Sequence, residues 1–448
     1  MAVAGVVALQ RLDQERRYRG LLAEGDAAMA SSHTYLAIEA YSGALAIKPD
    51  SMVAHYRRGE AYAAERQEAQ ALRDLHEARR LAPDAPEPLE ALGRLHDGKS
   101  DFAAAAAWYG QAAERLRDTD ARLLYALALA RYRTGALPSA RDAARRSVAR
   151  EATFAPAHYL AGLLAHDLRN PREAVTALEH AVRLEPSLVA ARQELASVYA
   201  ELGRFPEEAA QLRALASLDP QLDRHIALAM AQIRSADYPS AFAALASAEA
   251  LAPGDSRVAL ALGRVYLAMA EAGDRSAIGS ALTHLERALG GTARRSAGLA
   301  LYGRALHLSG DTAGAERLLQ DAVRTSPVDP SAFGYLADAT ETLGHPLAAR
   351  DALLSLDALE GNTTPPPVRV ARTRRIGALS LDGQDAAAAV TYLTQATRDA
   401  PDDSATMGLL ARALWMAGRR DDARRALGAA LALAADDPAL RRLERTLR

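Results

Sequence analysis

The sequence predicts an all-α fold, an α-solenoid of antiparallel helix pairs, from three observations. A period of 34 residues recurs along most of the 448-residue chain, which is typical of a repeat array rather than of several globular domains. Alanine, the best helix former, is abundant, while aromatic residues make up only 5% of the chain. Glycine and proline recur at fixed places in each period, where helices are expected to cross or end.

The repeat is defined by four positions with spacings of 12, 7 and 5 residues. A glycine is followed by two alanines and a proline, and five stretches match: Gly25, Ala37, Ala44, Pro49; Gly59, Ala71, Ala78, Pro83; Gly162, Ala174, Ala181, Pro186; Gly303, Ala315, Ala322, Pro327; and Gly377, Ala389, Ala396, Pro401. Small residues allow two helices to cross closely, and proline ends the second helix because it has no N–H. A further set of glycines lies where the first helix must stop: Gly135, Gly203, Gly310, Gly344 and Gly418.

These positions resemble those of the tetratricopeptide repeat family, in which each repeat is a pair of antiparallel helices. The resemblance covers nearly the whole chain and implies a right-handed superhelix of about twelve repeats. We assign the chain in order to an N-terminal apolar and charged helix (1–17), repeats 1–10 (18–363), a proline-rich link (364–369), repeats 11–12 (370–437) and a C-terminal capping helix (438–448). Three consecutive prolines predict a stiff, extended link that breaks or bends the array. A longer loop that leaves the stacking intact is the alternative.

The N-terminal segment begins with an apolar run over residues 2–9 and continues as a charged stretch. Eight residues are too few to span a bilayer, and no basic segment precedes them as in a signal peptide. Two interpretations remain open. The run is either a short apolar turn packed on the first repeat, or the C-terminal end of a longer membrane anchor. The anchor would place Arg11, Arg16, Arg17 and Arg19 just outside the membrane.

Patterns for catalysis, metal binding and nucleic-acid binding are absent from the sequence. There is no glycine-rich phosphate loop, no HExxH and no GxSxG. The chain has no cysteine and only two lysines, Lys48 and Lys99, and its eleven histidines are scattered. A net charge of −2 excludes a strongly basic nucleic-acid binder. We therefore expect no enzyme, no metal, no cofactor and no nucleic-acid partner.

A groove for a partner is what the resemblance implies instead. In the family, fixed positions of each first helix face a concave surface that binds peptides or proteins. Tyrosines there offer large amphipathic contacts, and arginines would bind acidic groups of a ligand. Packing between repeats and plain solvation are the alternatives. The positions carried over to this chain are Tyr56, Arg94, Tyr125, Leu129, Tyr132, Tyr159, His166, Ile226, Met230, Arg264, Arg304 and Arg412.

The resemblance implies a non-catalytic scaffold for protein–protein interaction, because fold alone does not supply chemistry. With the apolar N-terminus and the preference for arginine over lysine, we expect a bacterial cell-envelope or membrane-associated assembly with a periplasmic array. A cytoplasmic location is the alternative. Two other functions stay open. One is a sensor or docking region of a larger signalling enzyme, and the other is a self-assembling structural protein whose groove takes the N-terminus of another copy.

Overall fold

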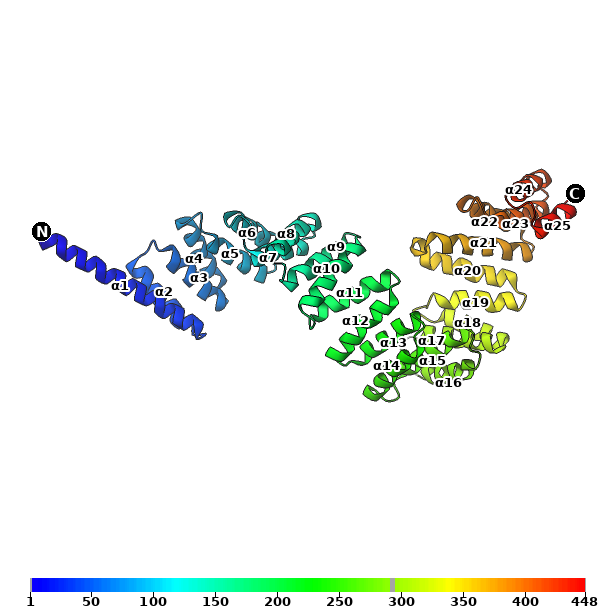
Figure 1. The fold of residues 1–448 in the computed structure, drawn as a ribbon, viewed down its shortest axis with the longest axis horizontal. Coiled ribbons are helices and arrows are strands. Elements are labelled where there is room, and N and C mark those ends of the chain that lie inside the picture. The colour runs from blue at the N-terminus through cyan, green and yellow to red at the C-terminus, as the bar shows by residue number, and fades with distance from the viewer. Residues whose placement is uncertain (1, 291–294, 448) are drawn as a thin grey trace. The chain divides into compact units, whose positions relative to one another are not determined.

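The computed structural model describes residues 2–290 and 295–447, and within these ranges the regular structure is entirely helical (Figure 1). Twelve consecutive helix pairs are followed by one short helix. The chain divides after Asp219 into two compact units. The predicted all-α repeat architecture is therefore confirmed, and each unit contains six of the pairs.

The first unit contains helices α1 to α12. Its pairs are α1 (Ala2–Ala30) with α2 (Thr34–Ile47), α3 (Met52–Ala64) with α4 (Glu68–Leu81), α5 (Pro86–Gly98) with α6 (Phe102–Arg115), α7 (Ala121–Arg133) with α8 (Leu137–Arg150), α9 (Ala155–Asp167) with α10 (Pro171–Leu184), and α11 (Val189–Glu201) with α12 (Phe205–Leu218).

The second unit contains six more pairs and the terminal helix. The pairs are α13 (Leu222–Arg234) with α14 (Tyr238–Leu251), α15 (Ser256–Glu271) with α16 (Ala277–Leu289), α17 (Arg295–Ser309) with α18 (Thr312–Arg324), α19 (Ser331–Thr342) with α20 (Pro346–Glu360), α21 (Pro366–Asp382) with α22 (Ala386–Asp399), and α23 (Ser404–Met416) with α24 (Arg420–Leu433). Helix α25 (Pro438–Thr446) follows, and its Leu440 is buried against Leu427 of α24 and Ala411 of α23.

Seven of the described pairs have a close contact between a glycine of the first helix and a large residue of the second. A Cβ added to Gly162 would lie 2.5 Å from Leu178 Cγ, and one added to Gly303 would lie 2.5 Å from Leu319 Cγ. Leu178 and Leu319 are themselves fully buried. The prediction that a small residue allows the two helices to cross closely is confirmed.

The helix ends follow from local backbone chemistry. The five glycines predicted to stop first helices all have positive φ angles, which glycine adopts without a Cβ clash. Many starts carry an Asp, Ser or Asn whose side chain accepts a hydrogen bond from the first turn, as Asp120 does from Leu123 N–H at 3.1 Å. These caps and glycines determine the residues at which the helices begin and end.

The proline-rich segment is not an extended link, contrary to our assignment of residues 364–369. Helix α20 is followed by a 3₁₀ turn (Gly361–Thr363), and α21 already begins at Pro366, because proline is well suited to the first turn of a helix. Leu353 of α20 and Leu379 of α21 belong to one buried cluster. Stacking is therefore continuous here, and the division between compact units lies at Asp219 instead.

The N-terminal segment continues directly into the first repeat, because α1 is one helix from Ala2 to Ala30. The interpretation of residues 2–9 as a turn is therefore wrong. Further along this helix, Leu9 and Leu12 are 67% and 66% exposed. None of the helices within residues 2–290 and 295–447 combines the length and apolarity needed to cross a membrane.

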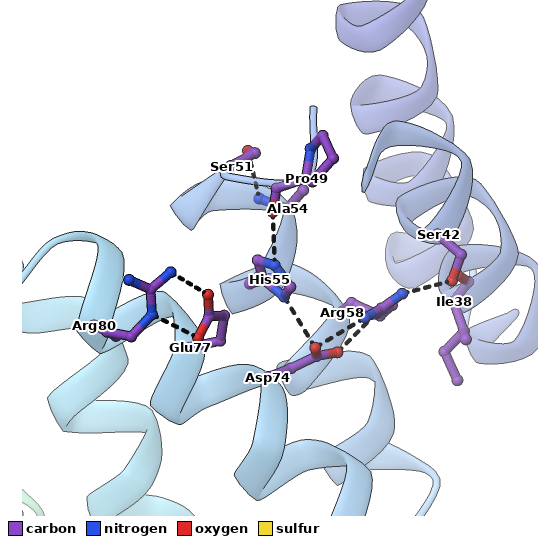
Figure 2. Close-up of polar contacts among 10 residues, drawn as sticks. All are labelled: Ile38, Ser42, Pro49, Ser51, Ala54, His55, Arg58, Asp74, Glu77 and Arg80. Atoms are coloured by element: carbon purple, nitrogen blue, oxygen red, sulfur yellow. Dashed lines mark hydrogen bonds and ion pairs between the residues drawn. The ribbon is translucent and has the colours of Figure 1, made fainter. Parts of the chain in front are cut away.

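A buried polar network links the first two repeats (Figure 2). Asp74 of α4 accepts hydrogen bonds from Arg58 Nε at 2.6 Å and Nη2 at 2.9 Å, and it lies 3.0 Å from His55 Nδ1. Arg58 also donates to Ser42 Oγ of α2 at 3.1 Å, and His55 Nε2 lies 3.0 Å from the carbonyl of Pro49. Both nitrogens of His55 thus face oxygen atoms of this chain, and the network joins α2, α3 and α4.

Candidate functional site

Ion pairs join first helices of consecutive pairs within each unit, and we call the side of these helices that carries them the first-helix face. Residues there are bonded to partners about one repeat away. In the first unit, Arg94 of α5 donates to Glu60 of α3 at 2.8 Å and also pairs with Glu90. Tyr56 lies on α3, four residues before Glu60, and its hydroxyl donates to that carboxylate at 3.0 Å. Burial together with the charge of Glu60 raises the pKa of Tyr56 to about 12.

The second unit has a similar ladder. Arg304 of α17 lies between Glu271 of α15, at 2.9 Å, and Asp338 of α19, at 3.1 Å. Arg375 of α21 then pairs with Asp338 at 2.7 Å and with Glu341. These bonds cross from repeat to repeat and keep the first helices in register.

The ladders change the interpretation of the predicted arginines. Arg94 and Arg304 are each held between two carboxylates of this chain, so the acidic groups that the sequence assigned to a ligand are supplied internally. Arg412 lies 3.8 Å from Asp382, while Arg264 is exposed. The partners were visible in the sequence as acids about 34 residues from each arginine, but only the register of the first helices brings them together.

The other predicted residues of the second unit lie on α13. Ile226 and Met230 are both half-buried there. They are one helical turn apart and so occupy one side of the helix.

The predicted residues of repeats 4 and 5 form the most coherent group. Tyr125, Leu129 and Tyr132 of α7 are half-buried against the core of the first unit, and Tyr159 of α9 is half-buried against the next cluster. Tyr125 packs edge-on against Phe154 with ring centroids 5.4 Å apart. Their rings are thus fixed by packing on one side and accessible on the other. We call Tyr125, Tyr132, Tyr159 and His166 the tyrosine patch.

Acidic side chains border the tyrosine patch, and we did not predict them from the sequence. His166 Nδ1 lies 2.6 Å from Glu194 Oε1, and His166 Nε2 lies 3.0 Å from Glu201. The hydrogen bonds to Glu201 and Glu194 raise the pKa of His166, although burial opposes them. Burial and a hydrogen bond to Asp167 likewise raise the pKa of Tyr132 to about 12. Acids at equivalent places in successive first helices were the signal available in the sequence.

The described residues contain no group of three or more histidine, cysteine, aspartate or glutamate side chains arranged to hold a metal ion. The imidazole of His166 lies between two carboxylates of α11, those of Glu194 and Glu201. What the tyrosine patch offers is aromatic surface, hydroxyl groups and negative charge.

Comparison with known proteins matches two stretches of the chain to tetratricopeptide repeat models, residues 159–223 and 380–447. No curated protein matches the chain. Solved structures with similar helix pairs include PilF of Pseudomonas aeruginosa (16% identity over 46% of this chain and 94% of that one, TM-score 0.37). They also include yeast Tom70 (14% identity, 97% and 95%, TM-score 0.41). YrrB, described as a TPR protein with an unusual peptide-binding site, is a third (17% identity, 41% and 94%, TM-score 0.36). Residues 159–223 and 380–447 are thus tetratricopeptide repeats, and the twelve helix pairs of the described residues are consistent with about a dozen such repeats.

Proposed function

We propose that this chain is a non-catalytic scaffold that binds a protein or peptide partner on its first-helix face. The observation that carries the proposal is the tyrosine patch, in which Tyr125, Tyr132 and Tyr159 are packed into the core on one side and accessible on the other. Tyrosines fixed in this way give large contact areas while little side-chain freedom is lost on binding.

A second feature supports a preformed binding surface. The ion pairs between consecutive first helices hold neighbouring repeats in register, as Arg94 does with Glu60. Because folding already orders this surface, a partner that binds across several repeats causes little further loss of conformational entropy in the chain.

The test is affinity capture from the cell that makes the protein, with the full chain as bait. A triple variant, Tyr125→Ala, Tyr132→Ala and Tyr159→Ala, is expected to lose the partner that the unaltered chain captures. Tyr35→Ala is the matched control, because Tyr35 is a 68% exposed tyrosine on a second helix of the same unit. Circular dichroism should show unchanged helix content in both variants. Equal capture by all three baits would contradict the proposal.

We further propose that the chain works in a bacterial envelope assembly, close to a membrane that the start of α1 contacts. Leu9 and Leu12 are exposed there, and arginines follow at positions 11, 16, 17 and 19, a combination suited to an anionic lipid surface. The chain should sediment with vesicles of phosphatidylglycerol, and deletion of residues 2–12 should abolish this. A concentration-dependent mass in light scattering that is lost on the same deletion, without vesicle binding, would favour self-assembly instead.

A further inference from the structure

The tyrosine patch differs from the rest of the first-helix face in the way its acids are paired. Elsewhere an arginine neutralises the carboxylates, as Arg94 does for Glu60 and Glu90, and Arg304 does for Glu271 and Asp338. The patch has no such arginine, although it lies on the same kind of ladder.

Three carboxylates border the patch from α9 and α11. Asp167 lies near enough to the hydroxyl of Tyr132 to add to the effect of burial on its pKa, while Glu194 and Glu201 are hydrogen-bonded to His166. Within the described part of the chain, no arginine or lysine forms an ion pair with any of the three. The nearby Arg133 is bonded to Asp97 at 2.8 Å and packs over the ring of Phe102.

The aromatic groups lie among these charges. Tyr159 is close enough to Glu194 for that carboxylate to contribute to its raised pKa, after burial, and it likewise interacts with Tyr125. Neither Tyr125 nor Tyr159 has a hydrogen bond from its hydroxyl within the described residues. Ring faces, free hydroxyl groups and carboxylates are the groups that bind a guanidinium or an ammonium.

We infer that the tyrosine patch binds an arginine or lysine side chain of an extended partner segment, between the rings of Tyr125, Tyr132 and Tyr159 and the carboxylates of Asp167, Glu194 and Glu201. The inference rests on the proposed function and specifies the partner's chemistry. The partner's cation takes the place that Arg94 and Arg304 fill elsewhere on the first-helix face. The two glutamates then serve both His166 and the ligand.

The test is a selection of random twelve-residue peptides displayed on phage against the full-length chain. Selected peptides should be enriched in arginine and lysine. A synthetic copy of one of them should bind with an affinity that falls as salt is raised from 50 to 500 mM, because the charges are partly exposed. The double variant Glu194→Gln and Glu201→Gln should weaken binding about tenfold, as loss of charge-assisted hydrogen bonds predicts.

Two further variants sharpen this test. Asp118→Asn with Asp142→Asn is the matched control, because it removes two carboxylates of the same unit that pair with Arg146, away from the tyrosine patch. It should leave affinity unchanged within about twofold. His166→Arg should place a cation of the chain itself beside the two glutamates and leave the fold unchanged. It should weaken peptide binding as much as the double glutamate variant does.

The outcomes separate the inference from the function on which it rests. Peptides that bind the patch but carry no excess of basic residues, or that are insensitive to both the glutamate and the His166 variants, overturn the inference and leave peptide binding intact. If no selected peptide binds the unaltered chain more tightly than the triple tyrosine variant, the proposed function itself is contradicted.

Discussion

At the scale of single residues, a close constraint is the glycine that faces a large side chain in seven of the described helix pairs. Gly162 meets Leu178, Gly303 meets Leu319, and Gly377 meets Leu393, each at 2.5 to 2.6 Å from an added Cβ. A methyl group cannot fit there unless α9 and α10 move apart or Leu178 leaves its preferred rotamer. The glycine thus sets the distance between the two helices of its pair.

Gly162→Ala is therefore expected to destabilise the first unit by about 1 to 3 kcal/mol, the usual cost of overpacking. Gly110→Ala is the control, since an added Cβ there has only an ordinary 3.9 Å contact with Leu127. The control should raise stability slightly, because alanine is the better helix former. Urea unfolding followed by circular dichroism measures both, and equal effects would show that the close contact is not what matters.

The contribution of His166 to stability should depend on pH. Hydrogen bonds to Glu201 and Glu194 raise its pKa above the ordinary 6.5, so its contribution to stability is complete below that value. The contribution is lost as the pH rises through the higher value of the folded state. The free energy of unfolding lost in His166→Gln should thus be larger at pH 5.5 than at pH 8.5, by about 0.5 to 1 kcal/mol. A difference that is constant or larger at pH 8.5 would contradict this account.

At the scale of the helices, most boundaries could be predicted and a few could not. The 34-residue register places the first helices correctly, because glycine with positive φ ends them at Gly135 and Gly203. The register fails at Pro365–Pro367, where composition alone suggests an extended link. Proline is equally suited to the first turn of a helix, and packing of α21 against α20 selects that outcome.

The candidate site can be compared with the sequence in the same way. Family positions point to the tyrosines and His166, and their role in binding a partner stays a prediction. They do not give Glu194 or Glu201, nor the pairing of Arg94 and Arg304, because a single sequence does not contain the distance between side chains one repeat apart. The structure supplies that distance.

A helix start in the second unit allows a direct test at this scale. Asp403 accepts hydrogen bonds from Thr406 N–H at 3.0 Å and from its hydroxyl at 2.6 Å, and pairs with Arg374 at 3.1 Å. Burial opposes them, but these bonds together lower the pKa of Asp403. Asp403→Ala should cost about 1 kcal/mol in thermal or urea unfolding, as the loss of a helix cap does.

Its neighbour provides the control. Asp402 is exposed and lies outside the cap, so Asp402→Ala should change the stability little. Because the pKa of Asp403 is lowered in the folded state, its charge stabilises the fold fully above the ordinary carboxyl pKa of 3.8. The cost of Asp403→Ala should therefore shrink as the pH falls from that value through the lower pKa of the folded state. Equal costs for both alanine variants would argue that capping does not hold α23.

At the scale of the whole molecule, the two compact units each contain six repeats that contact mainly their neighbours in sequence. The stability of such an array is close to a sum of repeat and interface terms. Residues 1–219 expressed alone should therefore remain helical and unfold cooperatively, with fraying confined to α11 and α12 at the new end. Circular dichroism and amide exchange test this, and an unfolded fragment would show that six repeats need the rest of the chain.

The most direct measurement of the central claim is photocrosslinking in the cell that makes the protein, with p-benzoylphenylalanine replacing one tyrosine at a time. We predict that a partner is crosslinked from position 132 and from position 159, on the first-helix face, and not from position 35, on a second helix. The adduct from 132 should weaken when Glu194 and Glu201 are both changed to Gln. Adducts from position 35 with none from 132 or 159 would contradict the claim that the first-helix face binds the partner.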